Sequence, residues 1–416
     1  MSDTTPGSGT PTPPNDAEST VSPTSMGGSW ADAKAQQERS MARMIWNRFT
    51  EHKLGVTGAI IIVVLLFLFI FAEFFSPYDY QRTHYQYAYV PPMLTRIHFD
   101  DFRPFVYGLK REPKTVEING QTTRLPGVWD YQEDKSKKYY IHFFVKGSEY
   151  KLLGLIPWDV HLFGVNTSRR SAGQLFLLGT NANGKDVLSR ILFAGRVTLG
   201  IAPGVVLISF LLGTLLGGIS GFFGGAIDTF MQRITEIFMS LPRLALLLVL
   251  MIFLNSAGTI PAIYRVYAII GIMAIVNWAL IARVVRGQFL TLRESEYTQA
   301  ARAVGANNMR IITRHIMPNI TSYLVVAATL AVPDIVILES ILSFLNFGIQ
   351  HPLVSWGSLL STFTQQGIYQ QMQFYPWMIL PAAFIVLTVL AFNFLGDALR
   401  DAVDPYSVVS TEGDDE

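Results

Sequence analysis

Six long apolar runs are the feature that most constrains the fold of this chain. The first, residues 54–75, has 22 residues, which as an α-helix would rise about 33 Å and cross a bilayer once. Pro242 and Arg243 interrupt the third run and the fourth is short, so five crossings is the alternative count. The runs predict an all-α integral membrane protein with about six transmembrane helices. The other five runs cover residues 197–219, 237–254, 267–281, 320–345 and 377–395.

The composition agrees with a membrane protein and argues against other classes. Charged residues make up 15% of the 416, below the roughly one quarter usual for globular proteins. The 32 basic and 31 acidic side chains leave no net field to attract nucleic acid. The chain has no cysteine, its 7 histidines lack metal-ligand spacing, and no hydrolase or metalloprotease motif occurs. We therefore expect no metal site and no catalytic centre.

The distribution of charge predicts the orientation in the membrane. Residues 1–28 are rich in Pro, Ser, Thr and Gly and are predicted to form a disordered cytoplasmic tail. Residues 29–53 mix basic with large apolar side chains, as in an amphipathic helix on the cytoplasmic membrane surface. The later loop 282–319 has six arginines against two glutamates. Because basic residues favour the cytoplasmic side, both termini are predicted to be cytoplasmic, including a C-terminal tail over residues 401–416.

The segment between the first two runs, residues 76–190, is predicted to be external. Loops much beyond about 60 residues are translocated regardless of charge. Residues 115–118 and 121–125 alternate around an Asn119-Gly120 turn, which predicts a β-hairpin, and residues 139–145 predict another strand. This external (periplasmic) insert is therefore expected to contain β-structure, and residues 191–400 are expected to form the transmembrane core. In and just after the second apolar run, glycine recurs at four-residue spacing, which allows close helix packing in the bundle or against a partner. These glycines are Gly200, Gly204, Gly213, Gly217 and Gly221.

Residues 179–186, GTNANGKD, come close to a phosphate-binding loop without fulfilling its chemistry. That loop needs a hydroxyl after its lysine to hold magnesium, and here Asp186 would repel phosphate instead. We therefore expect no nucleotide to bind there.

Residues 296–319, EYTQAARAVGANNMRIITRHIMPN, are the most informative polar stretch. Two helical patterns meet at Gly305, where a turn is favoured, and Pro318 stands where a new element begins. The pattern predicts a helix, a turn and a second helix on the cytoplasmic side. The alternative is an ordinary loop on the membrane surface.

This stretch resembles the coupling loop, or EAA motif, of ABC-transporter permeases, in which Glu-Ala-Ala is followed by Gly and later by Ile-x-Leu-Pro. The pattern falls on Gln299-Ala300-Ala301, Gly305 and Ile316-Met317-Pro318, with Gln replacing Glu and Met beside the proline. Three more stretches are similar to the C-type permease of oligopeptide and dipeptide importers. They are Leu178-Gly179-Thr180 with Gly184 to Arg190, Glu339-Ser340 with Ser355-Trp356-Gly357, and Leu395-Gly396-Asp397 with Asp404-Pro405.

The resemblance implies a permease subunit of an ATP-driven importer of oligopeptides or dipeptides in the bacterial inner membrane. It implies a second permease, two ATPase subunits that bind ATP and magnesium, and an external substrate-binding protein, with no cofactor on this chain. Alternatives are an importer for another small substrate such as nickel, a stand-alone secondary transporter or channel, or a membrane enzyme or receptor. The coupling loop would span residues 283–319, with contacts at Glu296, Gln299, Ala300, Ala301, Arg302, Gly305, Ile316 and Pro318.

Two acidic residues in the fifth apolar run are candidates for the translocation pathway. Charges inside membrane spans are costly and usually mark a pathway or a partner. Asp334 and Glu339 are therefore placed in the pathway as a hypothesis, and a buried salt bridge from Glu339 to the partner permease is the alternative. Arg243 is interpreted as a side chain that reaches the cytoplasmic face.

Overall fold

The computed structural model describes residues 43–118, 121–152, 154–165, 174–256, 258, 260–364 and 372–403. The predicted N-terminal tail, residues 29–42 of the predicted amphipathic helix and residues 404–416 of the C-terminal tail lie outside the described residues. Residues 43–51 are helical. The chain divides into two compact units, Met1–Arg48 and Phe49–Glu416, and the following account concerns the second.

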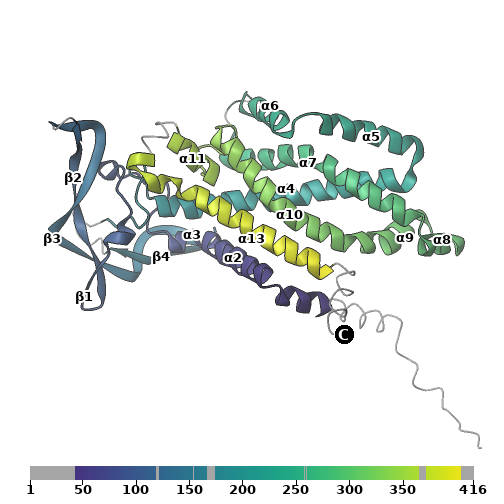
Figure 1. The fold of residues 1–416 in the computed structure, drawn as a ribbon, viewed down its shortest axis with the longest axis horizontal. Coiled ribbons are helices and arrows are strands. Elements are labelled where there is room, and N and C mark those ends of the chain that lie inside the picture. Colours follow the sequence, from purple (N-terminus) through teal and green to yellow (C-terminus); the bar gives the residue numbers. More distant parts are fainter. Residues whose placement is uncertain are drawn as a thin grey trace, which may run out of the picture. The chain divides into compact units, whose positions relative to one another are not determined.

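Long helices make up most of this unit (Figure 1). Among the described residues, five helical runs are long and apolar enough to cross a membrane, or six if one bent pair is a single span. The prediction of an all-α membrane protein with about six crossings is thereby confirmed. The five runs are α2 (Lys53–Ile70), α4 (Val187–Phe223), α7 (Ala262–Arg293), Asn308–Phe344 with α9 (Asn308–Ile311) and α10 (Met317–Phe344), and Pro376–Val403 with α13 (Leu380–Val403).

The bent pair is formed by α5 (Gly225–Ser240) and α6 (Arg243–Ser256), whose axes differ by 87°. Between them Leu241 is extended, with φ −89° and ψ 138°. A proline disfavours helical backbone in the residue before it and lacks the N–H that would continue the helix, so Pro242 explains the break. The predicted span over residues 237–254 is therefore not one continuous helix.

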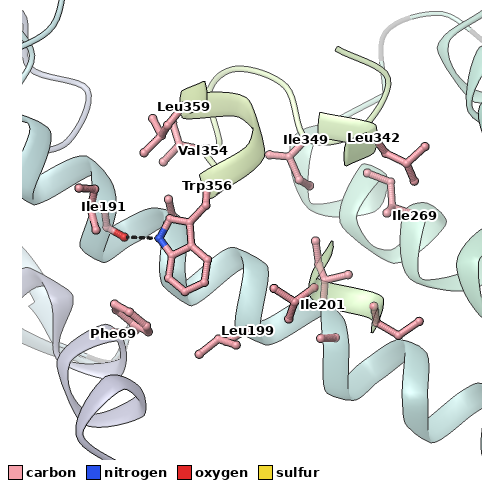
Figure 2. Packing of buried hydrophobic residues seen from close by; sticks show 14 of the residues in the cluster. Phe69, Ile191, Leu199, Ile201, Ile269, Leu342, Ile349, Val354, Trp356 and Leu359 are labelled. Carbon is pink, nitrogen blue, oxygen red and sulfur yellow. Dashed lines mark hydrogen bonds between the residues drawn. The ribbon is translucent and has the colours of Figure 1, made fainter. Parts of the chain in front are cut away.

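The hydrophobic core is centred on Trp356, the first residue of α11 (Trp356–Thr364), as Figure 2 shows. Its ring is fully buried and meets Phe69 of α2 edge to face, with ring centroids 5.5 Å apart. The indole Nε1 donates a hydrogen bond of 3.2 Å to the carbonyl oxygen of Ile191 in α4. Burial of such a large side chain contributes strongly to packing, and the hydrogen bond satisfies its one donor. Trp356 thus joins α2, α4 and α11.

Helices α4 and α7 pack against each other along the glycine repeat. A Cβ atom added at Gly217 would lie 2.3 Å from the carbonyl oxygen of Ala282, and one at Gly213 would lie 2.7 Å from the Cβ of Ile281. Only glycine permits so close an approach of the two backbones. The repeat therefore makes contact within the bundle, one of the two packing roles expected for it.

A four-stranded antiparallel sheet lies between the first helices and α4, in the order β1-β2-β3-β4. The predicted hairpin is present, because Ile118 pairs with Gln121 and Thr115 with Arg124, although the turn at 119–120 lies outside the described residues. The predicted strand 139–145 is part of the longer β3. The strands are β1 (His98–Asp100), β2 (Arg103–Ile118), β3 (Gln121–Leu152) and β4 (Ile156–Val165).

Two polar contacts join α3 and the residue that follows it to α4 and to the sheet. Arg196 of α4 donates to the carboxylate of Glu73 in α3 (Ala72–Phe75), with Nη1 2.6 Å from Oε1. His161 of β4 is buried, and its Nδ1 lies 2.6 Å from the carbonyl oxygen of Ser76. The chain therefore returns to the start of α4 close to where it left α3.

Candidate functional site

The segment that resembles a coupling loop forms a short helix attached to the C-terminal end of α7. Helix α8 (Glu296–Ala303) follows α7 after two residues. The hydroxyls of Ser295 and Thr298 donate to the carbonyl oxygen of Leu292, at 2.6 and 2.8 Å. Thr298 is fully buried, whereas the remaining residues of α8 are exposed or half-buried. One side of helix α8 is thus attached to α7, and the other side is exposed.

Gly305 ends this helix with a sharp turn. Its φ of +89° is in the left-handed region that glycine adopts without strain, and no atom would obstruct an added Cβ. Asn307 then caps α9, since its Oδ1 accepts from the Arg310 backbone N–H at 2.8 Å. A π-helical turn (Ile312–Ile316) connects α9 to α10. The predicted helix, turn and second helix are all present.

A second attachment joins α8 to α10. The Asn319 Nδ2 lies 3.2 Å from the hydroxyl oxygen of Tyr297, to which it donates. The same amide donates to the carbonyl oxygen of His315 at 2.6 Å. Helix α8 is therefore linked by hydrogen bonds to both α7 and α10. The sequence did not single out Tyr297, Thr298 or Asn319, because these contacts need the folded turn.

The structure separates the predicted coupling residues by exposure. Ala301 is half-buried, and Ile316 is completely buried in a cluster with Phe289 and Ile311. Ile316 thus anchors the second helix, whereas most of the other predicted coupling residues lie at the surface. The exposed group is Glu296, Gln299, Ala300, Arg302, Gly305 and Pro318.

A cavity of about 330 Å³ lies among α4, α6, α7 and α10. Most of its lining is apolar, and the few polar side chains include Asn277 and Tyr323. Asp334 and Arg243 both line it, one from α10 and one from the start of α6. Neither forms an ion pair with another described residue, and the Arg243 Nε is buried without a hydrogen-bond partner there. The cavity thus offers opposite charges to a ligand.

Glu339 does not line this cavity. Its side chain is 1% exposed and accepts from the Thr198 hydroxyl at 3.2 Å and from the Ser343 hydroxyl at 2.6 Å. Those hydroxyls in turn accept from the backbone N–H groups of Trp356 and Ile349. The carboxylate thereby joins α4, α10 and the segment before α11. Asp334 and Glu339 are therefore not brought together.

The loop that resembles a phosphate-binding loop has a structural role at the start of α4. Asp186 caps this helix, since its Oδ2 accepts from the Ser189 backbone N–H at 2.8 Å. Burial raises the pKa of the Asp186 carboxyl to about 6. Within the described residues, no group of three His, Cys, Asp or Glu side chains could hold a metal ion.

Comparison with known proteins relates the chain to transport permeases. The model for the binding-protein-dependent transport system inner membrane component matches residues 213–407, and that for the N-terminal TM domain of oligopeptide transport permease C matches residues 40–92. The oligopeptide transport system permease protein OppC of Bacillus subtilis is 30% identical over 379 residues, 90% of this chain and 93% of the relative. OppC of Haemophilus influenzae is 40% identical over 228 residues, 55% of this chain and 69% of the relative.

Two more proteins are similar. The dipeptide transport system permease protein DppC of Bacillus subtilis is 38% identical over 229 residues, 55% of this chain and 68% of the relative. Among solved structures, a chain of the methionine ABC transporter MetNI in an inward-facing conformation is 21% identical, with a TM-score of 0.42 over 52% of this chain and 97% of that chain. The full-length similarity to OppC shows that the chain belongs to the binding-protein-dependent transport permease family.

Proposed function

We propose that this chain is one of two permease subunits of an ATP-driven importer of oligopeptides or dipeptides. The observation that carries the proposal is the similarity to OppC of Bacillus subtilis over 90% of the chain. The partners would be a second permease, two ATPase subunits and a substrate-binding protein. ATP and magnesium would bind to the ATPases, and this chain would hydrolyse nothing.

The coupling step is supported by the way α8 is held. An ATPase groove would receive the exposed side of α8, where Gln299, Ala300 and Arg302 lie. Because hydrogen bonds link α8 to both α7 and α10, a displacement of α8 would move the two helices together. Gly305 would let the chain turn back without a side chain obstructing the groove.

The cavity between α4, α6, α7 and α10 is proposed as this chain's part of the translocation pathway. It is lined by α7 and α10, the helices to which α8 is attached. A peptide with free termini has one positive and one negative end, which Asp334 and Arg243 complement. For Glu339, whose oxygens already accept from two hydroxyls, the contacts support a role in holding α4 and α10 in place.

The proposed orientation places residues 283–319 and both termini in the cytoplasm and the β-sheet outside the inner membrane. Its support is the excess of arginine in the loop that contains α8. Under this orientation the ATPases lie on the side of α8 and the substrate-binding protein on the side of the sheet.

The test is co-purification of the tagged chain from its native membrane in mild detergent. We expect a second permease and two ATPases with the wild type, and loss of the ATPases from Gly305→Glu. Gly154→Glu is the matched control, since Gly154 in the β3–β4 turn also has a positive φ, of +74°, and open space around it. It should retain the ATPases.

Three results would overturn parts of this proposal. A chain that purifies alone and transports in vesicles would establish a stand-alone transporter. If the Gly305→Glu variant still co-purified with the ATPases, the proposed coupling role of α8 would be contradicted. Uptake of nickel in place of peptides by the intact complex would change the substrate.

A further inference from the structure

A second cavity, of about 410 Å³, lies at the N-terminal end of α4, at the opposite end of that helix from α5. Its walls come from the loop before α4, the first turn of α4, the segment between α10 and α11, and α11 itself. It shares no lining residue with the cavity that contains Asp334. Cavities of this volume are large enough for small-molecule ligands.

The charged side chains of this second cavity all belong to basic residues. Arg190 and Lys185 line it, together with His351, and the lining contains no Asp or Glu. The Arg190 Nε is buried and has no hydrogen-bond partner among the described residues, and its guanidinium forms no ion pair with any of them. The Arg190 side chain as a whole is half-buried. A buried N–H donor without an acceptor is costly, so the arrangement favours an anion in the cavity.

Burial and the same excess of positive charge shift the pKa of Lys185. Burial lowers the pKa of its ammonium group, and the positive charge of Arg190 lowers it further. Asp79 acts in the opposite direction and is the weakest of the three influences. An anion between Lys185 and Arg190 would relieve the repulsion between them.

The neutral polar groups add hydrogen-bond donors. The Asn181 Oδ1 already accepts from the backbone N–H groups of Asn183 and Lys185, at 3.0 and 2.9 Å. Its amide nitrogen forms no hydrogen bond within the described chain and remains available. A site with cations and free donors and no free carboxylate matches a ligand that only accepts hydrogen bonds.

The loop that carries Lys185 is fixed before any ligand arrives. The Trp377 Nε1 donates to the carbonyl oxygen of Thr180 at 3.1 Å, and the Thr180 hydroxyl donates to the carbonyl oxygen of Tyr87. Gly184 adopts a φ of +69° and lies so close to His84 that an added Cβ would meet its carbonyl oxygen. A fixed loop lowers the entropy cost of binding.

We propose that this cavity binds the terminal carboxylate of a peptide, held by Arg190 and Lys185. The proposal rests on the proposed function, which supplies the peptide. A carboxylate accepts two parallel hydrogen bonds from a guanidinium, a geometry that an ammonium group alone cannot offer. In the proposed orientation the cavity opens near the sheet, on the side from which peptides arrive.

The test measures binding of trialanine and of trialanine amide to the full chain, assembled with its partner subunits in lipid nanodiscs, by isothermal titration calorimetry. We expect the free acid to bind at least tenfold more tightly than the amide. Arg190→Gln and Lys185→Gln should each remove most of this preference. Lys185→Arg preserves the charge and should keep it, and Lys151→Gln, at an exposed lysine of β3, should leave it unchanged.

Equal binding of acid and amide by the wild type would overturn the carboxylate site while leaving a peptide importer intact. If acetate bound as tightly as trialanine, the cavity would be a site for small free anions, and the proposed peptide-carboxylate site would also be overturned. Lys185 and Arg190 are both half-buried, and Lys185→Gln tests the site independently if Arg190→Gln does not fold. Failure of the assembled complex to bind or transport either peptide would instead contradict the proposed function.

Discussion

Two stretches of α10, about one and a half turns apart, place carboxylates in opposite surroundings. Asp334 is exposed in the cavity that also contains Arg243, and no described residue donates a hydrogen bond to it. Glu339 is buried, and its two oxygens accept from hydroxyls of α4 and α10. This difference indicates that a charged side chain in a membrane helix can bind a ligand only if other protein groups do not already satisfy its hydrogen bonds.

The largest expected effect comes from removing the buried carboxylate. Glu339→Ala leaves the Thr198 and Ser343 hydroxyls without their acceptor and opens a void, so we expect a loss of about 4 kcal/mol in unfolding free energy. Unfolding in mixed detergent micelles measures it, with Asp334→Ala as the control. A loss below about 1 kcal/mol for Glu339→Ala would remove the structural role.

Asp186 offers an intermediate case, since only one of its oxygens accepts hydrogen bonds. Burial raises its pKa from 3.8 to about 6, so the folded chain keeps a proton that the unfolded chain releases between these values. The associated stability is fully present below pH 3.8 and is lost as the pH rises through 6. The loss is about 3 kcal/mol.

Asp186→Asn should remove this contribution, because the amide can still cap α4 and does not ionise. Unfolding measured at pH 4 and pH 7.5 should therefore show a smaller decline for the variant than for the wild type. Identical declines would mean that Asp186 does not titrate in this range.

A smaller loss of stability is expected when one hydrogen-bond donor to the Glu339 carboxylate is removed. Thr198→Val keeps the shape of the side chain and removes one hydroxyl, which should cost about 1 to 2 kcal/mol. Thr329→Val, at a half-buried position of α10 whose hydroxyl forms a solvent-exposed hydrogen bond only within its own helix, is the matched control and should change stability little. Equal losses of stability for the two substitutions would show that the hydrogen bond from Thr198 to Glu339 adds no stability of its own.

The smallest effect on stability is expected at Asp334. Asp334→Asn should change the unfolding free energy by less than about 0.5 kcal/mol, because the side chain is exposed. Peptide uptake should nevertheless fall about fivefold, which corresponds to about 1 kcal/mol. Uptake into cells that contain equal amounts of assembled complex measures this, and unchanged uptake would exclude Asp334 from the pathway.

Much of the fold follows from local sequence patterns. The apolar runs predicted the helices, and alternation around Asn119-Gly120 predicted the hairpin in which Thr115 pairs with Arg124. Pro242 marked the third apolar run as interrupted, but averaged hydropathy did not show the 87° bend between α5 and α6. Averaged hydropathy also underestimated the length of α7, because this helix continues through Arg283 and Arg286, beyond the end of the apolar run.

The site was less predictable, because its contacts join distant parts of the chain. The spacing of Ser343 four residues after Glu339 could have indicated one hydrogen bond within the helix. Thr198 lies 141 residues away, and no local pattern relates it to Glu339. The placement of Arg243 and Asp334 in one cavity likewise depends on the bend between α5 and α6, whereas the sequence assigned Arg243 to the membrane surface.

The packing of α2 has a consequence for how the chain is made. Gly55 and Gly58 of α2 lie against Ala398 and the carbonyl oxygen of Ala391, both in α13. About 310 residues separate the end of α2 from the start of α13. At typical rates of protein synthesis, α2 waits roughly 15 to 60 s in the membrane before α13 exists. Its high mean hydropathy of 2.7 suits a helix that must remain in lipid without its final neighbour.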